Sequence, residues 1–507
     1  MGRVCTGDSK RLWGLCFGFF LLFFGFFAAQ NEVTPVLGSF GSLSLGMLNG
    51  CFAASALVAP ALLRCLSSAC HSCKKGDGHM TAGLDSASKS SLLRAETAGL
   101  VVGSLCYAPF IASCAVSSLH WGQMVGSVIL GIGAGLLWVS QGSLLTACCT
   151  ESNRGVWAGR FWAAFMGGNA IGNFAGSAIA SIFSVSTLFL VLAAVTVISG
   201  VVFGVMVRPR AVNRIEAGTI TDAATNTDRE HGSRQDSKLT SPLLSSPKDT
   251  PTEPPTACAA SFLEDMRHLG RIFKKPSLFL LIPLLFFIGA ENAFWGGAFP
   301  ELLKELGMGG SVGLVMGVLA VADMVTSLAA GWVLDKCSAS NKSSSLWPPR
   351  IILLIGLGAF VGGLALVSFE LRPALVNHMH NSTRNHTSIY LFQSVHSYPG
   401  QNLVLFRIAY VSAGLMGMGD AIANTVMLAR LGKLSDDLGL IPRTTAFQYF
   451  QCTDVLMTCA AFVYAPAIPI EASLGQPLLL AGLAAVAFLT FLCARLPEVQ
   501  ASRKISN

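Results

Sequence analysis

Residues 21–32 read LLFFGFFAAQNE, and residues 284–293 read LLFFIGAENA. In both stretches a run of leucine and phenylalanine leads into alanine and then into amide or acidic side chains. The two stretches stand at corresponding places in the two halves of the chain. This similarity favours an internal repeat, in which two related sets of apolar helices are joined in one polypeptide.

The composition of the whole chain indicates a membrane protein. Its 507 residues are 52 % hydrophobic and 12 % charged, whereas soluble proteins average about 25 % charged residues. The mean hydropathy of +0.59 agrees. The net charge of +7 does not indicate a nucleic-acid partner, because the basic residues lie between apolar runs and form no stripe with aromatic side chains.

Twelve apolar runs are long enough to cross a bilayer, which needs about 20 residues of helix. The first run is too long for the apolar part of a signal peptide, so we interpret it as a retained helix. The sequence therefore predicts an all-α membrane protein with twelve transmembrane helices. The runs are residues 11–31, 44–63, 95–116, 122–147, 160–182, 185–206, 276–298, 310–334, 350–369, 403–430, 444–468 and 476–495.

The connections between these runs predict the domains and the orientation. Lysine and arginine are retained on the cytoplasmic side, and with both termini cytoplasmic nearly all of the 34 fall on that side. We expect one six-helix bundle over residues 1–206 and a second over 276–507. The cytoplasmic linker between them, 207–275, is rich in Ser, Thr, Pro and charge, so it is predicted to be disordered. The kind of membrane is left open.

One predicted outer loop, residues 370–402, carries two sequons for N-linked glycan. They begin at Asn381 and Asn385, on the side where glycan is added. A third sequon, at Asn341, falls in a cytoplasmic connection and is expected to stay bare. We therefore expect a glycoprotein modified at the first two asparagines.

The stretch Gly331-Trp-Val-Leu-Asp335-Lys336 resembles the loop motif of major facilitators. That superfamily places six helices on either side of a cytoplasmic link, which is the arrangement expected here. The glycine would allow a tight helix end, while the acid and the base would pair with neighbouring helix ends. The corresponding loop after the second helix lacks the pattern, which argues against an ordinary two-state carrier.

Three further stretches resemble the Unc-ninety-three family of major facilitators, closest to the facilitator-domain branch numbered eleven. They are GIGAGLLWVSQGSLLT at 131–146, GRFWAAFMGGNAIGN at 159–173 and GMGDAIANTVMLARLG at 417–432. The chain departs from the family at Met166 and Val426, where the family usually has Gln. Characterised relatives include a regulatory subunit of a potassium channel and an escort for immune receptors, and others are treated as carriers. The resemblance therefore implies a fold and two possible roles.

Polar side chains inside the apolar runs are the candidate site. An ionisable group at bilayer depth costs roughly 2.5–3.5 kcal/mol, so each one needs a role. By analogy with facilitators, the first, fourth, seventh and tenth helices line a central cavity. The residues predicted to serve this cavity or the coupling of transport are Gln30, Asn31, Gln141, Glu291, Asp323, Asp420, Asn424 and Asp454.

Two interpretations of these groups remain open. Desolvation favours the protonated form of a buried acid, so such an acid can take up and release a proton. Alternatively, the groups pair between helices, where a hydrogen bond averages about 0.6 kcal/mol. For Gln448, Gln451 and Asp454, which share one helix face, a cavity and a partner helix are equally plausible neighbours.

Cysteines and histidines do not change this interpretation. Cys65, Cys70 and Cys73 lie near His71, but no second pair stands at zinc-finger spacing, so we expect no metal and no cofactor. No cysteine falls in a predicted outer loop, so we expect no structural disulfide. No catalytic pattern stands out, and we do not expect an enzyme.

Two functions therefore compete. The preferred one is a regulatory or trafficking subunit of another integral membrane protein, such as an ion channel, a receptor or a signalling complex. The alternative is a secondary transporter that couples a proton or a cation to the movement of a small solute or ion. The acids favour the transporter, whereas the incomplete loop motif and the implied relatives favour the subunit.

Overall fold

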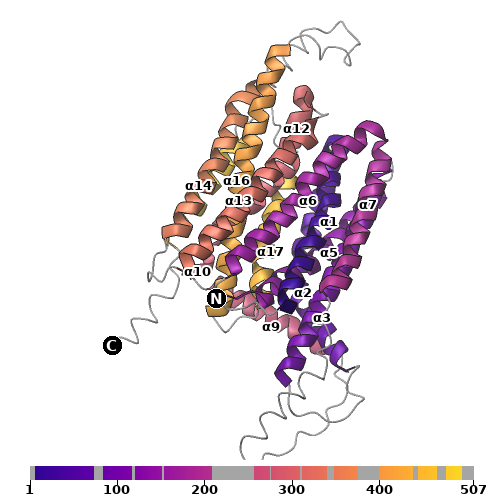
Figure 1. Ribbon diagram of the computed structural model, residues 1–507, viewed down its shortest axis with the longest axis vertical. Helices are drawn as coiled ribbons and strands as arrows, with labels where there is room; N and C mark the ends of the chain where they lie inside the picture. Colours follow the sequence, from indigo (N-terminus) through magenta and orange to yellow (C-terminus); the bar gives the residue numbers. More distant parts are fainter. Residues whose placement is uncertain are drawn as a thin grey trace, which may run out of the picture.

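The apolar runs form helices throughout the computed structural model of the chain (Figure 1). Every element of the described residues is a helix. The structure describes residues 6–72, 84–116, 120–150, 153–207, 256–274, 276–308, 311–339, 347–374, 399–437, 443–464 and 475–493.

Each of the six predicted runs of the first half corresponds to a helix or to two successive ones. The third run is divided at Cys106, and the sixth ends in a π-helical turn. The elements are α1 (Thr6–Leu37), α2 (Ser39–Ser72), α3 (Leu84–Leu105), α4 (Tyr107–Cys114), α5 (His120–Cys148), α6 (Arg154–Ile182), α7 (Val185–Val202) and η1 (Phe203–Val207).

The second half follows the same plan but is broken more often. Its first run, 276–298, ends in a π-helical turn, and a second such turn follows at Lys304–Met308, where Gly307 has a positive φ of 78°. The elements are α10 (Pro276–Phe279), α11 (Ile282–Ala293), η2 (Phe294–Ala298), α12 (Phe299–Leu303), η3 (Lys304–Met308), α13 (Val312–Ala339), α14 (Trp347–Leu366), η5 (Val367–Leu371), α16 (Pro399–Asp437), α17 (Arg443–Tyr464) and α18 (Gly475–Cys493).

Ten of the described helical segments are long and apolar enough to span a membrane. The two predicted spans missing from that set are α6 and α17, of 29 and 22 residues. Their lengths suffice to cross a bilayer at 1.5 Å per residue, but they carry more polar side chains. Both lie inside the bundle, so the polar residues that lower their hydropathy are packed against protein.

The two halves meet along two helix pairs, α2 with α17 and α6 with α13. In the first pair, the side-chain amide of Gln448 donates to the carbonyl oxygen of Leu57 at 2.6 Å. In the second pair, Gly331 lies against Gly155, and a Cβ on Gly331 would stand 2.6 Å from the Gly155 carbonyl oxygen. Small residues therefore let these helices approach closely, as is typical of membrane interfaces.

The prediction of a disordered linker through residue 275 is wrong over its last part. Helix α9 (Thr256–Phe273) lies at the end of the molecule where α1 begins (Figure 1). Its apolar side chains Phe262, Met266 and Leu269 recur on one face, and this face packs on α2 and α17. Buried Asp265 adds an ion pair to Arg64 of α2. An amphipathic face and one buried charge pair therefore order this segment.

Both ends of the predicted outer loop 370–402 are helical, because η5 ends at Leu371 and α16 starts at Pro399. Asn381 and Asn385 lie outside the described residues, as does Asn341. Their predicted modification stays a prediction.

Candidate functional site

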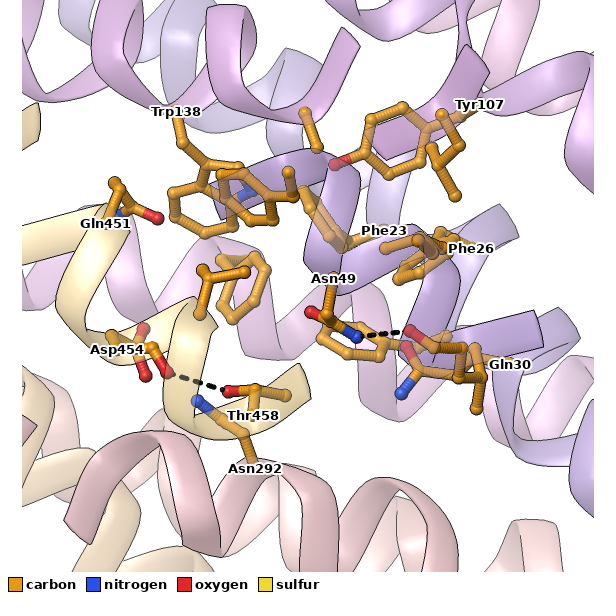
Figure 2. Close-up of a pocket in the computed structure, with 18 of the residues that line it drawn as sticks. Phe23, Phe26, Gln30, Asn49, Tyr107, Trp138, Asn292, Gln451, Asp454 and Thr458 are labelled. Carbon is orange, nitrogen blue, oxygen red and sulfur yellow. Dashed lines mark hydrogen bonds between the residues drawn. The ribbon is translucent and has the colours of Figure 1, made fainter. Parts of the chain in front are cut away.

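A cavity of about 120 Å³ lies between the two halves (Figure 2). Helices α1, α2, α4, α5 and α6 line it on one side, and α11, η2, α16 and α17 line it on the other. Because both halves contribute, a movement of one half against the other would change the shape of this cavity.

Aromatic rings from the first half form most of one side, which we call the aromatic wall. Its rings pack edge to face, with centroids 4.5 Å apart for Phe23 and Phe165 and 5.4 Å apart for Trp138 and Phe165. Such contacts hold the rings in place. The aromatic wall consists of Phe23, Phe26, Phe27, Tyr107, Trp138, Trp162 and Phe165.

Polar side chains form the rest of the lining, which we call the polar rim. Gln30 and Asn49 lie on one side of the cavity, and Asn292, Asp454 and Thr458 lie on the other (Figure 2). The Asn49 amide is held by its own helix, because it donates to the carbonyl oxygen of Leu45 at 2.8 Å. The polar rim consists of Gln30, Asn49, Asn292, Asn424, Gln451, Asp454 and Thr458.

Asp454 is the acidic residue of the polar rim and is only 7 % exposed. Its carboxyl group lies beside the amide of Asn292, yet one carboxyl oxygen has no hydrogen-bond partner in the part of the chain that the structure describes. The Thr458 hydroxyl donates to the main-chain carbonyls of Asp454 and Gly289, at 3.1 and 3.0 Å, and so ties α17 to α11. The backbone that carries Asp454 is therefore fixed, while its side chain keeps an unused acceptor beside the cavity.

Three further carboxyl groups meet directly behind the polar rim. Glu291 of α11, Asp323 of α13 and Asp420 of α16 are fully buried, and we call them the carboxyl cluster. Asp420 lies next to both Glu291 and Asp323. Adjacent carboxylates without a counter-charge repel each other, so the arrangement is stable only with protons held within it.

Asn424 connects the carboxyl cluster to the cavity. It lines the cavity, and its side-chain amide donates to the Asp420 carboxylate at 2.8 Å. On the other side of the cluster, Asp323 lies near the indole of Trp162, which belongs to the aromatic wall. Both oxygens of Glu291 and of Asp323 lack an N–H or O–H donor among the described residues. The cluster therefore adjoins the cavity at two points and keeps free acceptors.

The structure separates the eight predicted cavity residues into three groups. Gln30, Asn424 and Asp454 line the cavity. Glu291, Asp323 and Asp420 form the carboxyl cluster behind it. The remaining two, Asn31 and Gln141, are buried and do not belong to the lining.

Asn31 takes part in a bond between helices instead. Its amide donates to the Asn173 side-chain oxygen at 2.8 Å, and Asn173 in turn donates to the Asn169 side-chain oxygen at 2.5 Å. The chain of amides joins α1 to α6. The prediction that Asn31 faces the cavity is therefore replaced by a packing role, because its neighbours offer complementary amides.

The predicted loop motif lies within α13. Asp335 accepts from the backbone N–H groups of Gly155 and Val156, both at 2.8 Å, and so caps the start of α6 in the other half. Lys336 does not pair with a helix end but lies over the ring of Trp332 at 4.0 Å. Gly331 serves the crossing of α6 and α13 rather than a helix end.

Some features of the site lay beyond sequence reasoning. Glu96 of α3 is fully buried and accepts from the Ser143 hydroxyl, although it is not among the predicted site residues. Glu96 stands at the start of an apolar run, so the sequence alone does not show that its side chain is buried. The aromatic wall had no sequence signal, because the same residues would fill an ordinary core.

The expectation of no structural disulfide is wrong at Cys65, which is disulfide-bonded. Within the described ranges, no three His, Cys, Asp or Glu side chains are arranged to hold a metal ion.

Comparisons with known proteins agree with this architecture. Residues 79–492 match the family described as "Ion channel regulatory protein UNC-93". The chain is 23 % identical to UNC93-like protein 3 of Arabidopsis thaliana, over 85 % of this chain and 75 % of that protein. It is 22 % identical to UNC93-like protein MFSD11 of Xenopus tropicalis, over 90 % of each.

A solved structure shows the same fold. The fucose:proton symporter FucP of E. coli superposes with a TM-score of 0.51 and 14 % identity, covering 97 % of this chain and 100 % of that one. This likeness confirms the all-helical major facilitator fold, with its multiple membrane-spanning helices.

Proposed function

This chain belongs to the UNC-93 family of ion channel regulatory proteins, and we propose that it acts as a carrier that couples protons to the movement of a small solute. The observation that carries the proposal is the carboxyl cluster directly behind a cavity between the two halves. A purely structural bundle has no need for three adjacent acids, since each costs roughly 2.5–3.5 kcal/mol at bilayer depth.

In this proposal the carboxyl cluster stores protons and Asn424 relays their presence to the cavity. When Asp420 loses its proton, the Asn424 amide is drawn more strongly toward the carboxylate, because a hydrogen bond to a charged acceptor is the stronger one. The Asn424 side chain would then present a different face to a bound solute. Occupancy of the cavity and protonation of the cluster are in this way linked.

The two halves, residues 1–206 and 276–507, would rock against each other across the contacts of α2 with α17 and α6 with α13. Asp335 favours the conformation seen here, because its bonds to Gly155 and Val156 cross from one half to the other. Opening at that end requires these bonds to break. A carrier of this kind exposes its central cavity alternately to the two sides.

The test uses purified protein in sealed vesicles with an imposed proton gradient of either direction. A panel of labelled sugars, amino acids, amines and inorganic cations is offered. We expect one class to accumulate above its outside concentration, and a protonophore to abolish that accumulation. Equal uptake by empty vesicles for every member of the panel would contradict the proposal.

A second function is favoured by the description of the family, which names regulation of an ion channel. The chain would then bind another integral membrane protein through its lipid-facing helices, and the cavity would be a structural remnant or a regulatory site. Affinity purification from native membranes with mild detergent tests this role. Stoichiometric recovery of a channel subunit, with no accumulation of any solute, would favour it over the carrier.

A further inference from the structure

We propose that the central cavity binds a small organic cation, with the positive group beside Asp454 and the apolar part against the aromatic wall. This proposal rests on the proposed carrier function and names its substrate class.

The first argument for a cationic ligand is the charge of the cavity lining. None of the described residues that line the cavity is Lys, Arg or His, and Asp454 is the acidic member. The carboxyl cluster directly behind Asn424 adds three more acids and no base. A buried charge is costly unless it is paired, so an anionic ligand would meet no counter-charge in this lining, whereas a cation would.

The second argument is the missing partner of the Asp454 carboxyl group. Asp454 lines the cavity and is more than nine-tenths buried, and one of its carboxyl oxygens has no hydrogen-bond partner among the described residues. The polar side chains nearest to Asp454 at the rim, Asn292 and Thr458, are neutral (Figure 2). A ligand with a positive group would supply the missing partner.

The third argument is the affinity of the aromatic wall for a positive charge. The face of an aromatic ring carries negative electrostatic potential, so it attracts a cation, and tryptophan attracts it most. Trp138 and Trp162 stand on the wall, and Trp295 of η2 joins the lining from the second half. Rings on several sides suit an ammonium group that carries apolar substituents, because these substituents also gain from burial.

The size of the cavity limits the ligand. An apolar cavity of about 150 Å³ holds benzene, so the 120 Å³ present here suits a molecule of about five or six non-hydrogen atoms. Tetramethylammonium is a probe of this size. Its neutral counterpart tert-butanol has nearly the same shape and lacks the charge.

The experiment measures binding of these two probes to the purified full-length protein in lipid nanodiscs, by calorimetry and by tryptophan fluorescence. We expect tetramethylammonium to bind at least about tenfold more tightly than tert-butanol, and to change the fluorescence of the cavity tryptophans. This comparison uses the unaltered chain, so it does not depend on whether a variant folds.

A pair of variants then locates the binding. Asp454→Asn keeps the shape of the side chain and removes its charge, so we expect it to lose the tenfold preference. Glu264→Gln removes a charge from the exposed face of α9 and should leave the preference unchanged. Equal binding of the two probes, binding of neither, or a preference that survives in Asp454→Asn would overturn the proposal.

Failure here is distinguishable from failure of the carrier. If a neutral or zwitterionic solute accumulates in the vesicle assay, the carrier function stands and the substrate class proposed here is wrong. If tetramethylammonium binds through Asp454 but no solute accumulates, the site stands and the carrier function is wrong.

Discussion

At the scale of single residues, Asn424 is where the cavity and the carboxyl cluster meet. The analogy with facilitators, whose tenth helix lines a central cavity, predicts that Asn424 lies at the cavity, and in the structure it belongs to the lining. Its bond to Asp420 could not be predicted as a function, because residues four apart on a helix often pair without consequence. Only the three-dimensional arrangement adds Glu291 and Asp323 to the same group.

Replacing Asn424 by alanine should destabilise the protein. The Asp420 carboxylate would lose its amide donor, and an unsatisfied buried acceptor costs about 1–3 kcal/mol. We therefore expect a lower apparent melting temperature in detergent for Asn424→Ala. The matched control is Thr490→Ala, because the Thr490 hydroxyl donates only to carbonyl oxygens of its own helix, α18, among the described residues. A loss no larger than that of the control would show that the bond to Asp420 contributes little.

The sequence singles out the acids of the candidate site but not its aromatic rings. Glu291 and Asp420 stand out because a charge inside an apolar run is rare. Phe23 and Phe165 do not stand out, because phenylalanine is equally common in helices that face lipid, core or cavity. Asn31 illustrates the opposite error, since a buried amide can be satisfied by another amide on a neighbouring helix.

At the scale of elements, the contact of α13 with α6 is the clearest device for holding one conformation. Asp335 of α13 caps α6 through two backbone bonds. Burial raises the pKa of the nearby Cys149 thiol to about 12. Because the thiolate is the reactive form, Cys149 should react slowly with maleimide while this contact is closed.

The variant Asp335→Ala should speed that reaction. Loss of a helix cap costs about 1 kcal/mol, which corresponds to about a fivefold rise in the population of the open contact. Peptide mass spectrometry at Cys149 after timed labelling measures the rate. Lys336→Ala is the control, because Lys336 contacts Trp332 of its own helix. Equal labelling rates in the two variants would mean that Asp335 does not hold the contact.

Helix α9 shows why composition alone misjudged the linker. The Ser-, Thr- and Pro-rich segment before it dominates the average, while residues 256–273 carry their own amphipathic pattern. The contact with α2 includes the ion pair of Asp265 with Arg64. An element that touches helices of both halves can restrain their relative movement.

Asp265→Ala should release α9 from the bundle. Arg267 and Arg271 are exposed on this helix, yet trypsin cuts only chain that can unfold locally. We expect faster cleavage after these two residues in Asp265→Ala than in the unaltered protein, as read by limited proteolysis. Glu264→Ala, altered on the exposed face, should be cut at the normal rate. Unchanged cleavage in Asp265→Ala would mean that the apolar face alone holds α9.

At the scale of the whole molecule, the order of apolar runs predicted nearly all of the fold. The sequence predicts twelve apolar runs, and ten of the described helical segments are long and apolar enough to span a membrane; α6 and α17, the other two, carry more polar side chains. The π-helical turns after α11 could not be predicted, because nothing in FWGGA distinguishes them from regular helix. Their consequence is local, since η2 brings Trp295 into the cavity.

The orientation in the membrane gives a further prediction. If both termini are cytoplasmic, glycan is added at Asn381 and Asn385 and not at Asn341. Expression in a glycosylating eukaryotic cell should yield a band that a glycosidase shifts to lower mass. The double variant Asn381→Gln with Asn385→Gln should abolish this shift, whereas Asn341→Gln should preserve it. Glycan at Asn341 and none at Asn381 and Asn385 would contradict cytoplasmic termini.

The central claim is that the carboxyl cluster couples protons to solute movement, and Asp420→Asn in sealed vesicles tests it most directly. The solute is tetramethylammonium or whichever panel member accumulates. Asparagine keeps the shape of the aspartate side chain but cannot bind and release a proton. We therefore predict that gradient-driven accumulation is lost, while exchange of labelled for unlabelled solute persists. Exchange also shows that the variant is folded. Accumulation at the normal level in Asp420→Asn would contradict the account.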